Sequence, residues 1–209
     1  MSLLEAVHRV NFTRVTTLLS RGADVNMTDA HGVTPLIIAC ERGDLKMVDL
    51  LLEAKASTKM VTNSTQSSCL HIAAKNNAGD IVVRLLEVDP TIEERATSQG
   101  DTALMAACLS AVETQASATT LTALLRPSNG RGEVFLGPDD PRLRARNRHG
   151  HTALHCAALA QSPTAVRKLL EAGADCTVAD KAGRTAIEVA VNLMGKKKKA
   201  LREGARGAG

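Results

Sequence analysis

A short motif recurs along this 209-residue chain: threonine or serine, then any residue, then leucine or isoleucine. Successive copies start 33 or 34 residues apart, except for one interval of 50 residues. We call the first residue of each copy the opener. An alanine follows each opener by five residues, where its small side chain lets two helices approach closely. A fixed period of this length predicts stacked units that share one core. The openers are Thr34, Ser68, Thr102, Thr152 and Thr185, and the alanines are Ala39, Ala73, Ala107, Ala157 and Ala190.

The copy at residues 152–184 predicts two short amphipathic helices followed by a turn-forming segment. Thr152 is placed to cap the first helix. Gly173 is placed to close the second, because a residue without a Cβ adopts the left-handed conformation without strain. The apolar residues at helical spacing are Leu154, Ala157 and Ala158 in the first helix and Val166, Leu169 and Leu170 in the second.

Two parts of the repeat resemble the signatures of the ankyrin repeat. The signature TPLHxA is approached by TPLIIA at residues 34–39, SCLHIA at 68–73 and TALHCA at 152–157. The signature GADVN stands complete at residues 22–26 and as GADCT at 173–177. The resemblance implies a mainly α fold, an ankyrin-repeat solenoid of helix pairs with short β-hairpin-like fingers and one continuous core.

The period divides residues 1–209 into about six units of a single ankyrin-repeat domain. The first and last units are expected to be polar caps, and the domain is expected to begin where the chain begins. Residues 204–209 are expected to be a disordered tail. Clustered glycines and prolines predict an insertion loop at about residues 126–139. The units are expected at about 2–33, 34–67, 68–101, 102–151 with insertions, 152–184, and 185–203 as the last cap.

Several positions depart from the repeat or carry polar side chains at regular places. Lys55 stands where a helix-closing glycine is expected, and Asn77 replaces a glycine between two helices. Both are predicted at positive φ. The family resemblance implies that His71 and His155 hydrogen-bond the backbone of a neighbouring finger. Asn26 lies in a segment that resembles sites of asparagine hydroxylases in ankyrin proteins, although we favour a plain turn asparagine.

The insertion contains an apolar pair, Phe135 and Leu136. This pair is either an exposed tip that anchors in a partner's pocket or a segment that folds back against the stack, and the sequence leaves both open. Arginines alternate just beyond it, which predicts one charged, solvated side of an extended finger strand. These arginines are Arg142, Arg144, Arg146 and Arg148.

Charge is divided unevenly along the chain. Residues 1–105 carry 10 basic and 13 acidic side chains, whereas residues 106–209 carry 16 and 9, giving net charges of −3 and +7. A basic half can attract an acidic protein, nucleic acid or phospholipid head groups. With neither a signal peptide nor a membrane-length apolar run, we predict a cytoplasmic protein without membrane insertion. A nuclear location stays open, because the four lysines at residues 196–199 are compatible with an import signal as well as with a cationic helix end.

No catalytic or cofactor pattern accompanies the repeats. The five cysteines lack metal or disulfide spacing and are interpreted as reduced core residues. We predict no enzyme activity, no cofactor and no small-molecule substrate. Nucleic acid is the second class to weigh, but the basic half holds a single aromatic residue for stacking on bases. A zinc site is not predicted, because the directions expected for its candidate ligands do not converge: His149, His151, His155, Cys156 and Cys176.

The sequence therefore predicts a non-catalytic protein-protein interaction module, an adaptor, scaffold or regulator that is monomeric alone. In the family, recognition uses a concave groove of finger tips and first helices, and the resemblance carries this role onto the matching positions. Because the C-terminal half of the groove is cationic, we expect a protein partner with an acidic segment. The alternative is nucleic-acid or anionic-surface binding through the basic half. The groove positions are His31, Val33, Glu41, Arg42, Lys75, Asn76, Arg146, Arg148, His149, His151, Lys181 and Arg184, with Phe135 as an added apolar anchor.

Overall fold

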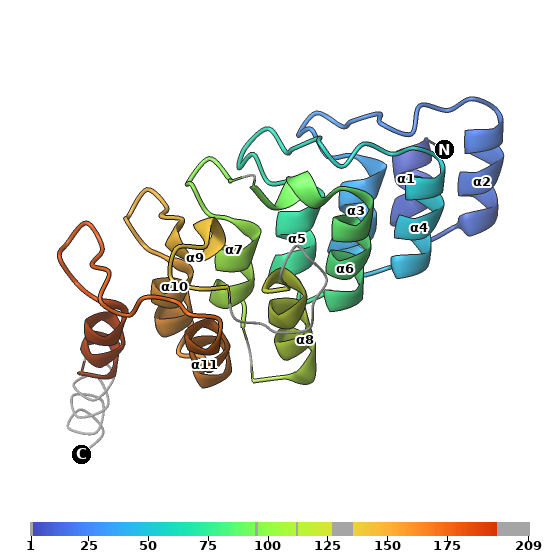
Figure 1. The fold of residues 1–209 in the computed structure, drawn as a ribbon. Coiled ribbons are helices and arrows are strands. Elements are labelled where there is room, and N and C mark those ends of the chain that lie inside the picture. Colours follow the sequence, from blue (N-terminus) through green and yellow to red (C-terminus); the bar gives the residue numbers. More distant parts are fainter. Residues whose placement is uncertain (1, 95, 112, 127–135, 196–209) are drawn as a thin grey trace, which may run out of the picture.

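The protein is a row of helix pairs with a hairpin-like finger between successive pairs (Figure 1). The computed structural model describes residues 2–94, 96–111, 113–126 and 136–195. A 3-10 helix η1 (Pro90–Glu94) follows α6, a one-turn helix α9 (Pro141–Arg144) precedes the finger before α10, and residues 186–195 are helical. This architecture confirms the predicted ankyrin-repeat solenoid. The first helices are α1 (Leu3–His8), α3 (Pro35–Arg42), α5 (Cys69–Lys75), α7 (Ala103–Leu109) and α10 (Ala153–Ala160); the second helices are α2 (Phe12–Ser20), α4 (Leu45–Glu53), α6 (Gly79–Val88), α8 (Gln115–Leu124) and α11 (Pro163–Glu171).

The openers cap the first helices, as the sequence predicts. The hydroxyl of Thr34 accepts the N–H of Ile37 at 3.2 Å, and Pro35 occupies the first helical position, where no N–H is needed. Thr152 caps α10 within a capping box that it forms with His155. Each opener thus fixes where its first helix begins.

Successive first helices form the core of the stack. α3 packs on α5, α5 on α7, and α7 on α10. The leucine two residues after the opener and the alanine five residues after it are almost fully buried in four units. Burying one leucine side chain contributes roughly 1.5–3 kcal/mol, and the small alanine lets the helices approach. These residues are Leu36, Leu70, Leu104 and Leu154, with Ala39, Ala73, Ala107 and Ala157.

Left-handed backbone marks the ends of many helices. Asn77 has a φ of 56° and Lys55 a φ of 66°, which confirms both predictions. Gly43 occupies the same place as Asn77 in its own unit, with a φ of 69°. Gln161 and Val10 are also left-handed, at 56° and 55°, although neither residue type marks such a turn. For a residue with a Cβ this conformation costs roughly 1–2 kcal/mol.

The end of the insertion folds back against α11. The N–H groups of Leu136 and Gly137 both donate to the carbonyl of Ala172, at 3.0 and 3.2 Å, and Leu136 packs half-buried against the core. A Cβ added at Gly173 would lie 3.0 Å from the Cα of Gly137, so this approach requires glycine. Of the two alternatives left open, Leu136 therefore takes the folded-back one. Phe135 lies outside the described residues.

The arginines after the insertion do not line one side of an extended strand, so that prediction is wrong. Asp140 caps a helical turn by accepting the N–H of Arg142 at 2.9 Å, and Pro141 takes the first position of that turn, which makes α9 helical. The Arg142 side chain is only 14% exposed and forms ion pairs with Asp140, at 2.9 Å, and Glu93, at 3.5 Å. Arg142 therefore joins η1 to α9 instead of facing solvent.

We predict that Lys55→Gly stabilises the protein. Glycine relieves the left-handed strain at φ 66°, so the free energy of unfolding should rise by a few tenths to about 1 kcal/mol, measured by urea denaturation. The reciprocal change, Gly22→Lys, places a Cβ at a φ of 85° and should lower it. A reduced melting temperature for Lys55→Gly would contradict the role of strain at this position.

Candidate partner-binding groove

In three fingers, one polar side chain holds the turn at the tip. The carboxylate of Asp29 accepts the N–H groups of His31 and Val33 at 2.8 and 2.9 Å. Asn147 and Asp180 do the same in later fingers, each accepting two backbone N–H groups at 2.8–3.0 Å. These local bonds fix the turn without help from a ligand, so the finger tips are preformed.

Backbone hydrogen bonds also join each finger tip to the next. Gly150 lies at this junction with a φ of 78°, and a Cβ there would be 2.8 Å from the nitrogen of Lys181, so only glycine permits the spacing. The bonds keep the side chains of neighbouring tips in a fixed register. From donor N–H to acceptor carbonyl, they run from Asn63 to His31, Ser98 to Thr65, Arg148 to Gln99 and Lys181 to His149, at 2.8, 2.8, 2.8 and 3.1 Å.

Two buried histidines connect first helices to the fingers, as the family resemblance implied. Nε2 of His155 donates to the carbonyl of Arg184, and Nε2 of His71 donates to the carbonyl of Asp101, both at 3.0 Å. Nδ1 of His155 accepts the N–H of Thr152 at 3.3 Å, which assigns the proton of the ring to Nε2. The prediction for both histidines is confirmed.

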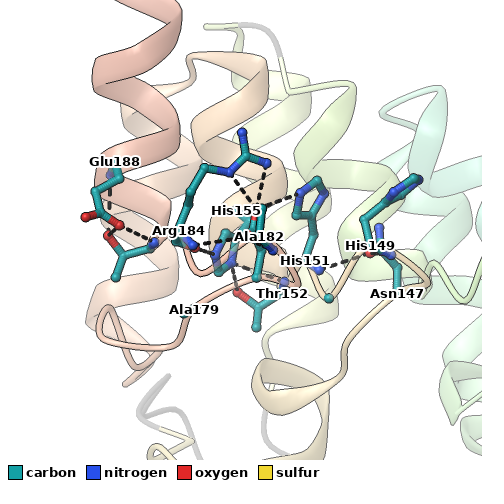
Figure 2. A network of polar contacts seen from close by, with 12 residues as sticks. Asn147, His149, His151, Thr152, His155, Ala179, Ala182, Arg184 and Glu188 are labelled. Carbon is teal, nitrogen blue, oxygen red and sulfur yellow. Dashed lines mark hydrogen bonds and ion pairs between the residues drawn. The ribbon is translucent and has the colours of Figure 1, made fainter.

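A polar cluster joins the last two fingers (Figure 2). The buried carboxylate of Asp180 lies 2.8 Å from Nη2 of Arg184 and 3.5 Å from Nε2 of His151. The backbone N–H of Arg184, and then its guanidinium, hold the pKa of Asp180 well below its usual range. Burial, followed by the neighbouring His155, lowers the pKa of His151. The rings of His149, His151 and His155 follow one another with centroids 5.5 and 5.6 Å apart.

Most predicted groove residues are exposed, on finger tips or at the ends of first helices. Val33 and His151 are half-buried, and Phe135 is not among the described residues. The side-chain amide of Asn76 donates to the carbonyl of Glu41 at 2.9 Å, which ties the end of α5 to that of α3. The exposed residues are His31, Glu41, Arg42, Lys75, Asn76, Arg146, Arg148, His149, Lys181 and Arg184.

Arg146 is more constrained than a solvent-facing side chain. Its guanidinium donates to the carbonyl of Gly150, at 3.2 Å, and to the carbonyl of Ala179 in the following finger. Arg148 and Lys181 are exposed, and within the described ranges neither forms an ion pair. At the predicted groove positions in the C-terminal half of the chain, the charges of these two side chains are available to a partner.

Leu109 occupies a predicted groove position that sequence reasoning missed. It lies seven residues after its opener, the same interval that places Glu41 and Lys75 in their units. It ends α7 and is 45% exposed. Counting from the opener through the fourth unit would have found it. Leu109 thus adds an exposed apolar side chain to the middle of the predicted groove.

The described residues offer neither a metal-binding cluster nor an activated thiol at Cys156. Among the residues that the structure describes, no three or more His, Cys, Asp or Glu side chains are grouped to hold a metal ion. Burial raises the pKa of the Cys156 thiol to about 12, so it is protonated and a poor nucleophile at neutral pH. In the same part of the chain, no helix combines the length and apolar character needed to cross a membrane.

The helix pairs, finger ladder and buried histidines define a solenoid of helical repeats. Two family models match the chain: ankyrin repeats (3 copies) over residues 3–94 and ankyrin repeats (many copies) over residues 139–190. The chain belongs to the ankyrin-repeat family. Members of this family are generally non-enzymatic, and membership supports a role as a protein-protein interaction module.

Relatives and solved structures agree with this assignment. Human ankyrin repeat and SOCS box protein 16 is 34% identical over 92% of this chain and 40% of its own length, and human B-cell lymphoma 3 protein is 33% identical over 81% and 36%. The chain thus spans about two-fifths of these curated relatives. The ankyrin repeat protein EF0377 superposes with a TM-score of 0.74 at 25% identity, covering 93% of this chain and 92% of that one. A chain from the complex of a Bdellovibrio bacteriovorus predatory endopeptidase with an immunity protein gives the same score and identity, covering 93% of both chains.

We predict that Asp180→Asn makes the protein less sensitive to acid. Because the folded-state pKa of Asp180 lies below its ordinary value of 3.8, its carboxylate adds stability above about pH 4, and this contribution is lost as the pH falls further. An amide oxygen can still accept the backbone N–H groups, as Asn147 does in the preceding finger. Chemical denaturation between about pH 7 and pH 2 should show a variant less stable at pH 7 whose stability falls less below pH 4. Parallel curves for variant and wild type would contradict the assignment.

Proposed function

We propose that this chain is an adaptor, scaffold or regulator that binds a protein partner in its concave groove, and that the partner presents an acidic segment. The observation that carries the proposal is the pair Arg148 and Lys181, exposed on adjacent finger tips. A backbone bond from Lys181 to His149 joins these two tips at 3.1 Å. Because the fingers are already fixed before binding, little conformational entropy is lost in ordering the backbone that presents the two charges.

The groove residues divide into those that shape it and those that contact a partner. The Arg146 guanidinium donates to the carbonyl of Gly150, and the Arg184 guanidinium pairs with Asp180. Both side chains therefore mainly hold the fingers in place. Leu109 supplies an exposed apolar contact from α7. The partner is therefore a segment with carboxylates and an apolar residue. A contribution from Phe135 stays a prediction.

A protein partner is supported by the family and by one structural neighbour, because the similar chain from Bdellovibrio bacteriovorus comes from a two-protein complex. The cytoplasmic location and the monomeric state stay predictions.

Binding to nucleic acid or to another anionic surface is the second candidate, favoured by the net charge of +7 over residues 106–209. Electrostatic binding of this kind falls steeply with salt and is independent of sequence. A groove with no described Phe, Tyr or Trp side chain lacks the large stacking platforms that single-strand binders use. Titration with oligonucleotides at rising salt separates the two candidates.

We predict that Arg148→Glu combined with Lys181→Glu weakens partner binding about tenfold at low salt, mainly by slowing association. Proteins captured from cells are compared by quantitative mass spectrometry, and the partner is then purified. Its association rate is measured by surface plasmon resonance at about 50 and about 300 mM salt, and the effect should shrink at the higher value because exposed charges are screened.

The matched control is Arg21→Glu combined with Lys46→Glu, which makes the same charge change at exposed positions on or next to the second helices α2 and α4. It should leave binding intact. Loss of the same partner from both double variants would indicate a general charge effect. A partner lost only from the control would place the binding site outside the concave groove.

A further inference from the structure

Among the finger tips, lysine and arginine occur only in the last two. The residue whose N–H joins a tip to the preceding one is neutral in the second and third tips, Asn63 and Ser98. In the fourth and fifth tips it is cationic, Arg148 and Lys181. Because all four residues make the same kind of backbone bond, the fold itself requires no charge at this position. The five tips span residues 29–33, 62–67, 97–101, 147–151 and 180–184.

The two cations come from tips that are in direct contact. The N–H of Lys181 donates to the carbonyl of His149 at 3.1 Å. The stem of Lys181 also lies against the preceding tip, because a Cβ added at Gly150 would be 3.0 Å from the Cγ of Lys181. The lysine side chain therefore runs beside the tip that carries Arg148. His149, which follows Arg148, is exposed, and its ring offers one more hydrogen-bonding group.

The donors of both cations are unused within the part of the chain that the structure describes. Arg148 and Lys181 are exposed, and neither side chain forms a hydrogen bond or an ion pair with another described residue. Carboxylates in these and the preceding tip have partners of their own. Asp180 pairs with Arg184 at 2.8 Å, and Asp101 accepts a side-chain amide at 2.8 Å. A guanidinium and an ammonium on adjacent tips are thus free to share one anion.

A phosphoryl group matches this pair of donors better than a single carboxylate does. On a serine or threonine it carries a charge of about −1.5 to −2 at pH 7 and has three strong acceptor oxygens. An arginine can bind two of these oxygens through parallel N–H groups, while a lysine acts as a point charge. A carboxylate has one negative charge, so it leaves one of the two cations without a counter-charge.

We propose that the acidic segment of the partner carries a phosphorylated serine or threonine, and that its phosphoryl group binds Arg148 and Lys181 together. This inference rests on the proposed function, because it names the residue that the concave groove selects in its partner. Phosphorylation of the partner then controls its binding to this chain. A nucleic acid is a poorer occupant, because each phosphodiester carries one negative charge and the first three tips offer its backbone no lysine or arginine.

The test titrates the full chain into fluorescein-labelled peptides GEESEEG whose serine is free, phosphorylated or replaced by glutamate. At about 50 mM salt, fluorescence anisotropy should show the phosphoserine peptide binding about tenfold more tightly than the glutamate peptide. Arg148→Glu combined with Lys181→Glu should weaken phosphoserine binding at least about tenfold and remove this preference. The control Arg21→Glu combined with Lys46→Glu should leave both affinities unchanged, and circular dichroism checks that both double variants fold.

Other outcomes separate this inference from the proposed function. Equal affinities for the phosphoserine and glutamate peptides, both weakened by the double variant at Arg148 and Lys181, would reject the phosphoryl site and leave an acidic partner segment standing. Affinities that this variant does not change would contradict the proposed function as well. Absence of saturable phosphoserine binding rejects the phosphoryl site, and the purified partner still tests the proposed function.

Competition distinguishes the sources of a phosphoryl group. The unlabelled phosphoserine peptide should displace the labelled one at a lower concentration than a thymidine dodecamer does, or than vesicles of phosphatidylcholine with added phosphatidylinositol phosphate do. Displacement at a lower concentration by the dodecamer would assign the site to nucleic acid, and by the vesicles to a membrane surface. Either result would overturn the proposal.

Discussion

The contact between successive first helices is the interaction on which the rest of the structure depends. A unit of two short helices cannot bury its own apolar residues, and isolated helices of this length are marginal in water. Leu104 and Ala107 are buried because α5 and α10 lie on either side of α7. Stability is thus a sum of contacts between neighbours, and each unit is folded only as part of the stack. The same dependence explains why Ile187, Val191 and Met194 of the last described helix are exposed, whereas the residues equivalent to Ile187 and Val191 in the second unit are buried.

The fingers depend on the helices and not the reverse. Once the first helices are stacked, the finger tips are brought close enough for the N–H of Lys181 to meet the carbonyl of His149. Gly150 permits this approach, and His155 ties its helix to the finger that follows. Polar bonds of this kind add modest stability each, but they leave the tips with one arrangement. A rigid scaffold that presents variable side chains on loops is well suited to recognition.

Repeat logic explains how much could be predicted from the sequence. Thr152, His155 and Lys55 were placed correctly because each is defined by its distance from an opener, and that distance fixes its environment. Gln161 and Val10 share a left-handed position with Gly43, yet their residue type gives no signal, because the surrounding helices impose the conformation. Arg142 was misplaced because an alternating pattern was given more weight than the helix-starting pair Asp140 and Pro141. The contact of Leu136 with the end of α11 could not be predicted from the neighbouring sequence, because its partner, Ala172, lies far along the chain.

The charge of the basic half illustrates why composition alone is a weak guide to function. A charge count from the sequence treats every arginine as equally available to a partner. Several arginines, however, already pair with groups inside the folded protein. Arg142 is enclosed by two carboxylates, and Arg184 is bound to Asp180. Arg148 and Lys181 remain exposed on neighbouring finger tips that backbone bonds hold together. A nucleic acid or lipid surface gains from many charges at any position, whereas two charges on fixed finger tips favour one arrangement of carboxylates in a partner. The distribution of unused charge, more than the net charge, is therefore what favours a folded or folding protein segment as the partner.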